Sequence, residues 1–185
     1  MWRIALALLL ACSACGAAPQ PKSARTVAAF EVPLLNAPDR EAFLALLGEE
    51  AKTEGFHVDA TDAEQLRQLS TVSPLTIDAA VWRGKDDDEC VASVLDGPDH
   101  PGLAWLTFSK GEQPERVARF RENVMRRIMR RWPKTLALPI APTGAIPLRE
   151  DLLLTSDGYR VKRQAASKYE LSPSSTLVAK GVRST

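Results

Sequence analysis

Three strand-like runs with short connectors lie in the middle of the chain, and they limit its possible folds more than any other feature. The runs are Leu75–Arg83, Glu89–Leu95 and Leu103–Ser109. The connectors, Gly84–Asp88 and Asp96–Gly102, are rich in Gly, Asp and Pro, which are typical turn residues. Because short connectors favour antiparallel neighbours, the sequence predicts a three-stranded antiparallel meander.

Two segments with apolar residues at helical spacing flank this meander. The first is capped by Asn36 or Ala37, has Pro38 in its first turn and ends near Gly55. The second begins at Pro114 and ends at Trp132, which is followed by another proline. Both segments are predicted to be helices that cover the same sheet.

Four shorter elements complete the prediction. They are strands at Phe56–Asp59 and Thr135–Ile140, a short helix from Thr61 to Leu69 and a hairpin at Leu152–Val161. The order of elements combines local antiparallel pairing with one crossover helix. We therefore expect an α+β two-layer sandwich, with the three-stranded meander plus one or two further strands in a mainly antiparallel sheet and the helices on one face.

The N-terminus has the parts of a secretory signal. Arg3 precedes the apolar run Ile4–Ala11 and small residues follow. The run of eight residues is far shorter than the roughly 20 that span a bilayer. Leu9-Leu10-Ala11-Cys12 resembles the lipobox of bacterial lipoproteins.

This resemblance implies that residues 1–11 are removed and that Cys12 becomes a lipidated (palmitate-bearing) first residue. In Gram-negative lipoproteins an Asp after that cysteine favours the inner membrane, so Ser13 implies the outer membrane, with the domain facing the periplasm. The alternative is a plain secretory signal cut near Ala17 or Ala18, which would give a soluble periplasmic protein.

The mature chain is predicted to have three parts. Residues 12–30 are rich in Ala, Pro, Ser, Lys and Gln and are predicted to be a flexible, lipid-anchored tether. Residues 31–161 are predicted to form a single α+β domain. Residues 162–185 are polar and are predicted to be a C-terminal tail.

One side of the second long helix gathers arginines opposite its apolar arc: Arg116, Arg119, Arg126, Arg127 and Arg130. Arginine suits bidentate contacts with carboxylate or phosphate, so this stripe is the candidate partner-binding site. The alternative is a solvated helix face whose late positive charges favour the negative end of the helix dipole.

Charge is also divided along the chain. From Asn36 to Glu112 there are 16 acidic and 6 basic residues, and from Gln113 to Thr185 there are 6 acidic and 15 basic ones. Such a division indicates either attraction between the two halves or two opposed surface patches. The net charge of +1 argues against nucleic-acid binding driven by overall charge.

Other candidate sites are weak. The acidic run Asp86–Glu89 lacks the spacing of a calcium loop and is interpreted as a solvated turn. His57 and His100 lie near Asp59, Asp96 and Asp99, which is half of a general-base arrangement, but neither a Gly-x-Ser-x-Gly elbow nor a His-Glu-x-x-His motif occurs.

Cysteine and tryptophan offer further alternatives. Cys90 is interpreted as a small core residue, with a disulfide to Cys15 as the alternative. Trp82 and Trp105 would form either an aromatic platform on the open sheet face or packing beneath the C-terminal segment.

We expect a non-enzymatic, membrane-anchored protein that binds another protein, as an assembly or secretion accessory or as an immunity or inhibitor protein. Its partners would be the membrane, through the lipid, and a protein, without nucleic acid, metal or cofactor. Two other functions stay open. One is a hydrolase with a His/Asp pair, and the other is a lipid or small-ligand carrier with a cavity lined by Trp105, Leu106 and Phe108.

Overall fold

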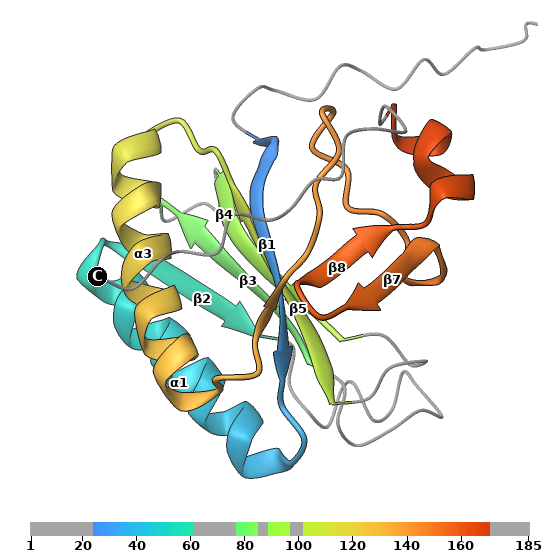
Figure 1. The fold of residues 1–185 in the computed structure, drawn as a ribbon. Helices are drawn as coiled ribbons and strands as arrows, with labels where there is room; N and C mark the ends of the chain where they lie inside the picture. Colours follow the sequence, from blue (N-terminus) through green and yellow to red (C-terminus); the bar gives the residue numbers. More distant parts are fainter. Residues whose placement is uncertain (1–23, 61–76, 85–88, 97–101, 171–185) are drawn as a thin grey trace, which may run out of the picture.

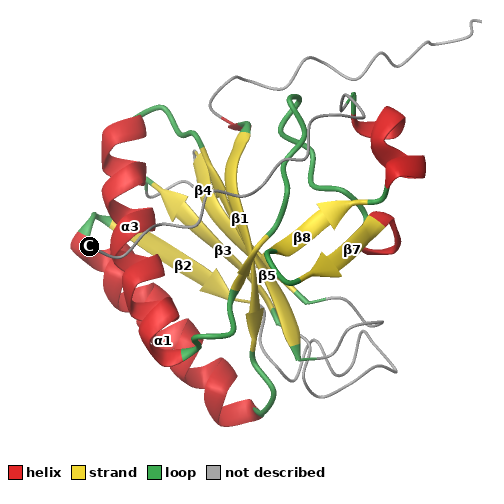
Figure 2. Cartoon of the chain, in the orientation of Figure 1, coloured by secondary structure: helices red, strands yellow, loops and turns green. Residues whose placement is uncertain are grey.

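The computed structural model describes residues 24–60, 77–84, 89–96 and 102–170. Two long helices, α1 (Ala37–Thr53) and α3 (Pro114–Arg131), cover one face of an antiparallel sheet (Figures 1 and 2). This arrangement is an α+β sandwich and confirms the predicted fold class. Of the two predicted caps, Asn36 is the one that caps α1, because its side-chain oxygen accepts a hydrogen bond from the backbone N–H of Asp39 at 2.9 Å.

The main sheet has the strand order β2-β3-β4-β5-β1-β6, and every neighbouring pair is antiparallel. Its strands are β1 (Thr26–Pro33), β2 (Phe56–Ala60), β3 (Asp78–Arg83), β4 (Glu89–Leu95), β5 (Leu103–Ser109) and β6 (Leu136–Ala137). Strands β3, β4 and β5 form the predicted meander. The helix predicted to begin at Thr61 lies outside the described residues.

Strand β1 changes the predicted domain boundary. The sequence analysis assigned residues up to 30 to the tether, whereas β1 begins at Thr26 and pairs with β5 through to Pro33. Ala28, Phe30 and Val32 pack against the core between the sheet and the helices. The prediction failed because alanines dilute the alternation of apolar and polar residues that identifies a strand in the sequence.

The main core lies between the sheet and the two helices. Phe120 of α3 contacts Phe56 of β2 and Phe108 of β5 edge-to-face, with ring centroids 5.4 and 5.9 Å apart. Phe43 of α1 packs against Trp132 at 5.9 Å. Full burial of side chains of this size contributes about 1.5–3 kcal/mol each, so these contacts fix α1 and α3 on the sheet.

A smaller unit packs on the opposite face of the sheet. The predicted hairpin is present as β7 (Leu152–Thr155) and β8 (Gly158–Val161), which form a separate two-stranded sheet (Figure 1). Leu152 and Tyr159 of the hairpin pack with Ala29 and Leu138 in a second apolar cluster. Trp105 contacts this cluster, as expected if the C-terminal segment covers it.

Two predictions for the C-terminal part were wrong in extent. The strand predicted at Thr135–Ile140 is only the two-residue β6, although one more bond, from Leu138 N–H to the Ala29 carbonyl at 2.8 Å, extends its contact with β1. The predicted tail begins with a 3-10 helix, η3 (Arg163–Tyr169), whose alanines 165 and 166 are buried. The folded domain therefore includes η3.

Candidate functional site

The arginine stripe of α3 is divided by its contacts, and its inner part faces α1. Arg127 forms ion pairs with Glu49 and Glu50 of α1, each at 2.8 Å. The hydrogen bonds that Arg127 donates to Glu50 and then to Glu49 raise the pKa of Arg127 above its ordinary value. Arg119 pairs with Glu54 at the end of α1 at 3.4 Å. Ion pairs near the surface contribute at most about 1 kcal/mol each to stability. Because these pairs join the two helices, Arg119 and Arg127 help to align α3 with α1.

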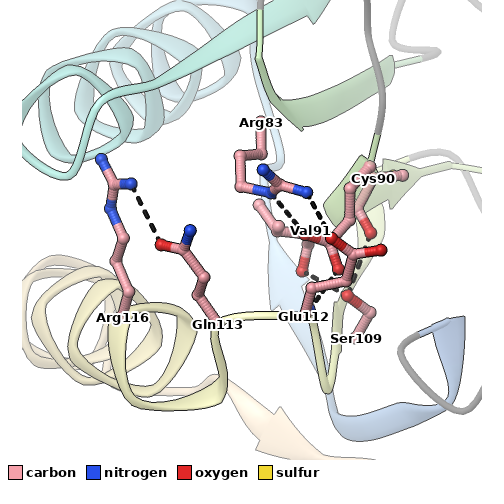
Figure 3. A network of polar contacts seen from close by, with 8 residues as sticks. Arg83, Cys90, Val91, Ser109, Glu112, Gln113 and Arg116 are labelled. Carbon is pink, nitrogen blue, oxygen red and sulfur yellow. Dashed lines mark hydrogen bonds and ion pairs between the residues drawn. The ribbon is translucent and has the colours of Figure 1, made fainter.

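Arg116 is held by the end of α1 and the start of β2. Its guanidinium carbon lies 5.1 Å from the ring centroid of Phe56, and its Nη1 donates a hydrogen bond to Gln113 at 3.2 Å (Figure 3). Gly55 has a φ of 69°, and a Cβ at this position would overlap Arg116 Nη2. The left-handed turn therefore favours glycine here, and a larger residue would also displace the end of the Arg116 side chain.

The outer part of the stripe is Arg126, Met129 and Arg130, which we call the outer arginine face. All three side chains are exposed, and 41% of the Met129 surface is accessible. Arg126 donates a hydrogen bond to Asn123 at 3.1 Å, but within the described part of the chain neither arginine has a carboxylate at ion-pair distance. Like charges four residues apart, as at Arg126 and Arg130, destabilise a helix by about 0.2–0.5 kcal/mol. The stability of the domain therefore gives no reason for placing these two arginines together.

The structure also explains part of the charge division. Ion pairs join the acidic segment, Asn36–Glu112, to the basic one that follows it, as between Arg119 and Glu54 and between Arg127 and the α1 glutamates. Attraction between the halves therefore uses several of the charges that the sequence separates. The outer arginine face keeps positive charge that no such pair neutralises.

A second network joins the end of β3 and the start of β4 to the residue Glu112 before α3 (Figure 3). Arg83 forms ion pairs with Glu89 at 2.8 Å and with Glu112 at 2.6 Å, and the Glu112 N–H donates to Glu89 at 2.5 Å. Glu89, the last member of the predicted acidic turn, is thus buried and paired, while Asp86–Asp88 lie outside the described residues. Among the described residues, no group of three His, Cys, Asp or Glu side chains is placed to bind a metal ion.

The described residues give little support to a hydrolase site with a His/Asp pair. His57 and Asp59 are exposed on the edge strand β2, and the residues opposite them on β3 are Trp82 and Ala80, which are neither nucleophiles nor acids. His100 and Asp99 lie outside the described residues. Asp96 is buried in an ion pair with Arg40 and also accepts the Gly102 N–H at 3.2 Å, which fits a structural role.

The cavity proposed for a ligand carrier is contradicted by the pleat of β5. Leu106 and Phe108 are fully buried beneath the helices, whereas Trp105 lies on the other face, beneath the hairpin. These three side chains therefore cannot line one cavity. The prediction failed because it grouped successive residues of a strand, whose side chains alternate between faces.

Cys90 lies half-buried on β4, outside the main core to which the sequence analysis assigned it. Its Sγ donates a hydrogen bond to the Ala92 carbonyl at 3.3 Å. Burial raises the pKa of this thiol above its ordinary value, which lowers its reactivity. Cys15, its proposed disulfide partner, lies outside the described residues.

The sequence analysis missed a buried acidic site beneath the hairpin. Glu31 of β1 is only 4% exposed, accepts hydrogen bonds from Tyr159 at 2.8 Å and Trp105 at 3.1 Å, and forms an ion pair with Arg149. A glutamate among the apolar residues of β1 was the signal in the sequence that could have indicated a buried acidic site. Its hydrogen-bond donors are distant in the sequence, so they could not be identified from it. With three donors, this carboxylate fixes the hairpin to the sheet.

A neighbouring group fixes η3 to the hairpin. Asp151 accepts a hydrogen bond from the Tyr169 hydroxyl at 2.7 Å and pairs with Lys168 at 3.2 Å. The Tyr169 hydrogen bond, more than Lys168, lowers the pKa of Asp151, and the same bond raises the pKa of Tyr169. Like the Glu31 site, this group holds parts of the fold together.

No protein-family model matches the chain, and no curated protein sequence matches it. Within the described residues, no helix is long and apolar enough to cross a membrane. Cys12, the predicted lipidation site, lies outside the described residues.

Proposed function

We propose that this chain is a lipid-anchored protein of the bacterial cell envelope that binds another protein through the outer arginine face. The observation that carries the proposal is the division of the α3 arginines. Arg116, Arg119 and Arg127 have partners within the domain, whereas Arg126 and Arg130, next to the exposed Met129, have no carboxylate partner in the described part of the chain.

The chemistry of this face indicates the kind of partner. Two arginines one helical turn apart can each bind a carboxylate through two parallel hydrogen bonds. Methionine next to them offers a flexible apolar contact that adapts to different shapes. The partner is therefore an acidic protein surface with an apolar patch beside its carboxylates, and the role is that of an assembly or secretion accessory or of an immunity or inhibitor protein.

The anchor follows from the resemblance of Leu9–Cys12 to a lipobox. Acyl chains on Cys12 would hold the domain at the periplasmic side of the outer membrane, since each buried methylene contributes about 0.8 kcal/mol. The proposal is non-enzymatic because the titratable groups described above, at Glu31 and at Asp151, are used to hold the hairpin and η3 in place.

Crosslinking in the native envelope tests the binding surface. A photo-reactive amino acid at Met129 should capture a partner, and the double change Arg126→Glu with Arg130→Glu should abolish the capture. Arg25→Glu with Arg163→Glu is the matched control, because these two arginines are also exposed and the change in net charge is the same. Capture that survives the α3 changes, or that disappears equally in the control, would contradict the proposal.

A further inference from the structure

We propose that two copies of this chain pair through the outer edge of β7, as antiparallel strands related by a twofold axis at Leu154. This pairing would join the two hairpins into one four-stranded sheet. It uses a surface separate from the outer arginine face and does not depend on the function proposed above.

The hydrogen-bond pattern of the hairpin leaves Leu154 pointing outward. In an antiparallel pair, residues that exchange hydrogen bonds alternate with residues that do not. The Lys162 N–H donates to the Asp151 carbonyl at 2.8 Å, so Asp151 faces β8 with its hydrogen-bonding groups. By alternation from Asp151, Leu153 and Thr155 do the same, opposite Arg160 and Gly158.

Leu152 and Leu154 consequently direct their backbone groups away from β8. The Leu152 N–H already donates to the Arg149 carbonyl. For Leu154, the part of the chain that the structure describes supplies neither an acceptor for the N–H nor a donor for the carbonyl beyond this edge. One residue thus presents a matched donor and acceptor to a further strand.

The side chains of this edge are apolar and unprotected. Leu153 and Leu154 are 54% and 57% exposed, and Leu148 just before them is 55% exposed. β7 contains neither a charged residue nor a proline, which are common means of preventing edge-to-edge association.

The edges of the main sheet are protected in these ways. β2 carries the exposed polar residues His57 and Asp59, and β6 is only two residues long, with Pro139 two positions later. Among the described edge strands longer than two residues, only β7 lacks a charged residue, which is consistent with use of its edge for pairing.

A second copy fits this edge because the edge is self-complementary. Around a twofold axis at Leu154, the N–H of each copy donates to the Leu154 carbonyl of the other, and the two exposed Leu154 side chains become neighbours. A two-stranded sheet gains stability when it becomes part of a larger one. The strand is short, so the dimer is expected to be weak and concentration-dependent.

Sedimentation of the full chain carrying Cys12→Ser, which cannot be acylated, tests this proposal. A concentration series should show a monomer–dimer equilibrium. Leu154→Pro removes the outward N–H and restrains the backbone of the edge, and Leu154→Lys places two positive charges together at the axis, so both should give monomers. Leu35→Lys is the matched control, because Leu35 is 66% exposed in a loop far from β7 in sequence, and this variant should still dimerise.

Disulfide trapping gives a second readout that does not depend on how well the proline variant folds. Cα atoms of a hydrogen-bonded antiparallel pair lie about 5.5 Å apart, within the range that a disulfide spans. With the three native cysteines replaced by Ser, Leu154→Cys should form a covalent dimer on mild oxidation, and Leu35→Cys should not. Monomers at every concentration, or a dimer that withstands both Leu154→Pro and Leu154→Lys, would overturn the proposal.

Discussion

Removal of the buried carboxylate of Glu31 should destabilise the domain strongly. Glu31→Ala leaves the Tyr159 hydroxyl, the Trp105 N–H and the Arg149 guanidinium without their shared acceptor. Loss of one partner from a buried ion pair typically costs 3–5 kcal/mol, and we expect a loss of about 3 kcal/mol here because Arg149 is partly exposed. Glu31→Gln keeps one acceptor oxygen, so its cost should be smaller, at about 1–3 kcal/mol.

Urea unfolding followed by tryptophan fluorescence measures this effect, since Trp105 lies in the site. The expected order of unfolding free energy is wild type, then Glu31→Gln, then Glu31→Ala. Glu41→Ala on the exposed side of α1 is the matched control and should change stability by no more than about 0.5 kcal/mol. A loss below about 1 kcal/mol for Glu31→Ala would refute the view that this carboxylate holds the hairpin on the sheet.

Three further outcomes follow from the structure. Gly55→Ala should cost about 1–3 kcal/mol in urea unfolding, because it strains a positive φ and displaces Arg116; an equal cost in an Arg116→Ala background would show that the arginine is not involved. The hydrogen bond from Tyr169 lowers the pKa of Asp151, so the stability that this carboxylate adds is present above about pH 4 and is lost as pH falls through its folded pKa. The difference in melting temperature between wild type and Asp151→Asn should therefore shrink toward pH 2, and a constant difference would contradict this assignment. With the other two cysteines replaced by Ser, Cys90 should react with iodoacetamide at pH 8 much more slowly in the folded chain than in urea, and equal rates would show that its pKa is not raised by burial.

The helices and the meander could be predicted from the sequence because their signals are local. Asn36 and Pro114 mark helix starts, and turn-forming residues separate β3, β4 and β5. β1 was missed because alanine fits a strand and a linker equally well. The addition of η3 to the domain could not be predicted, since it depends on contacts of Tyr169 and Lys168 with Asp151.

The candidate site was predictable in part. Periodicity placed five arginines on one side of α3, but it could not tell which of them face α1. Only the packing of the two helices shows that Arg119 and Arg127 meet glutamates, while Arg126 and Arg130 face outward. The Glu31 site was missed for the same reason, because its donor Tyr159 is far away in the chain.

The proposed anchor is tested most directly by the mass and location of the mature protein. Mass spectrometry of the protein isolated from membranes should find a chain that begins at an acylated Cys12. The change Cys12→Ser should prevent acylation and shift the protein out of the membrane fraction. An unmodified chain that begins after Ala17 or Ala18 and is recovered in the soluble periplasmic fraction would contradict the proposal of a lipid-anchored binding protein.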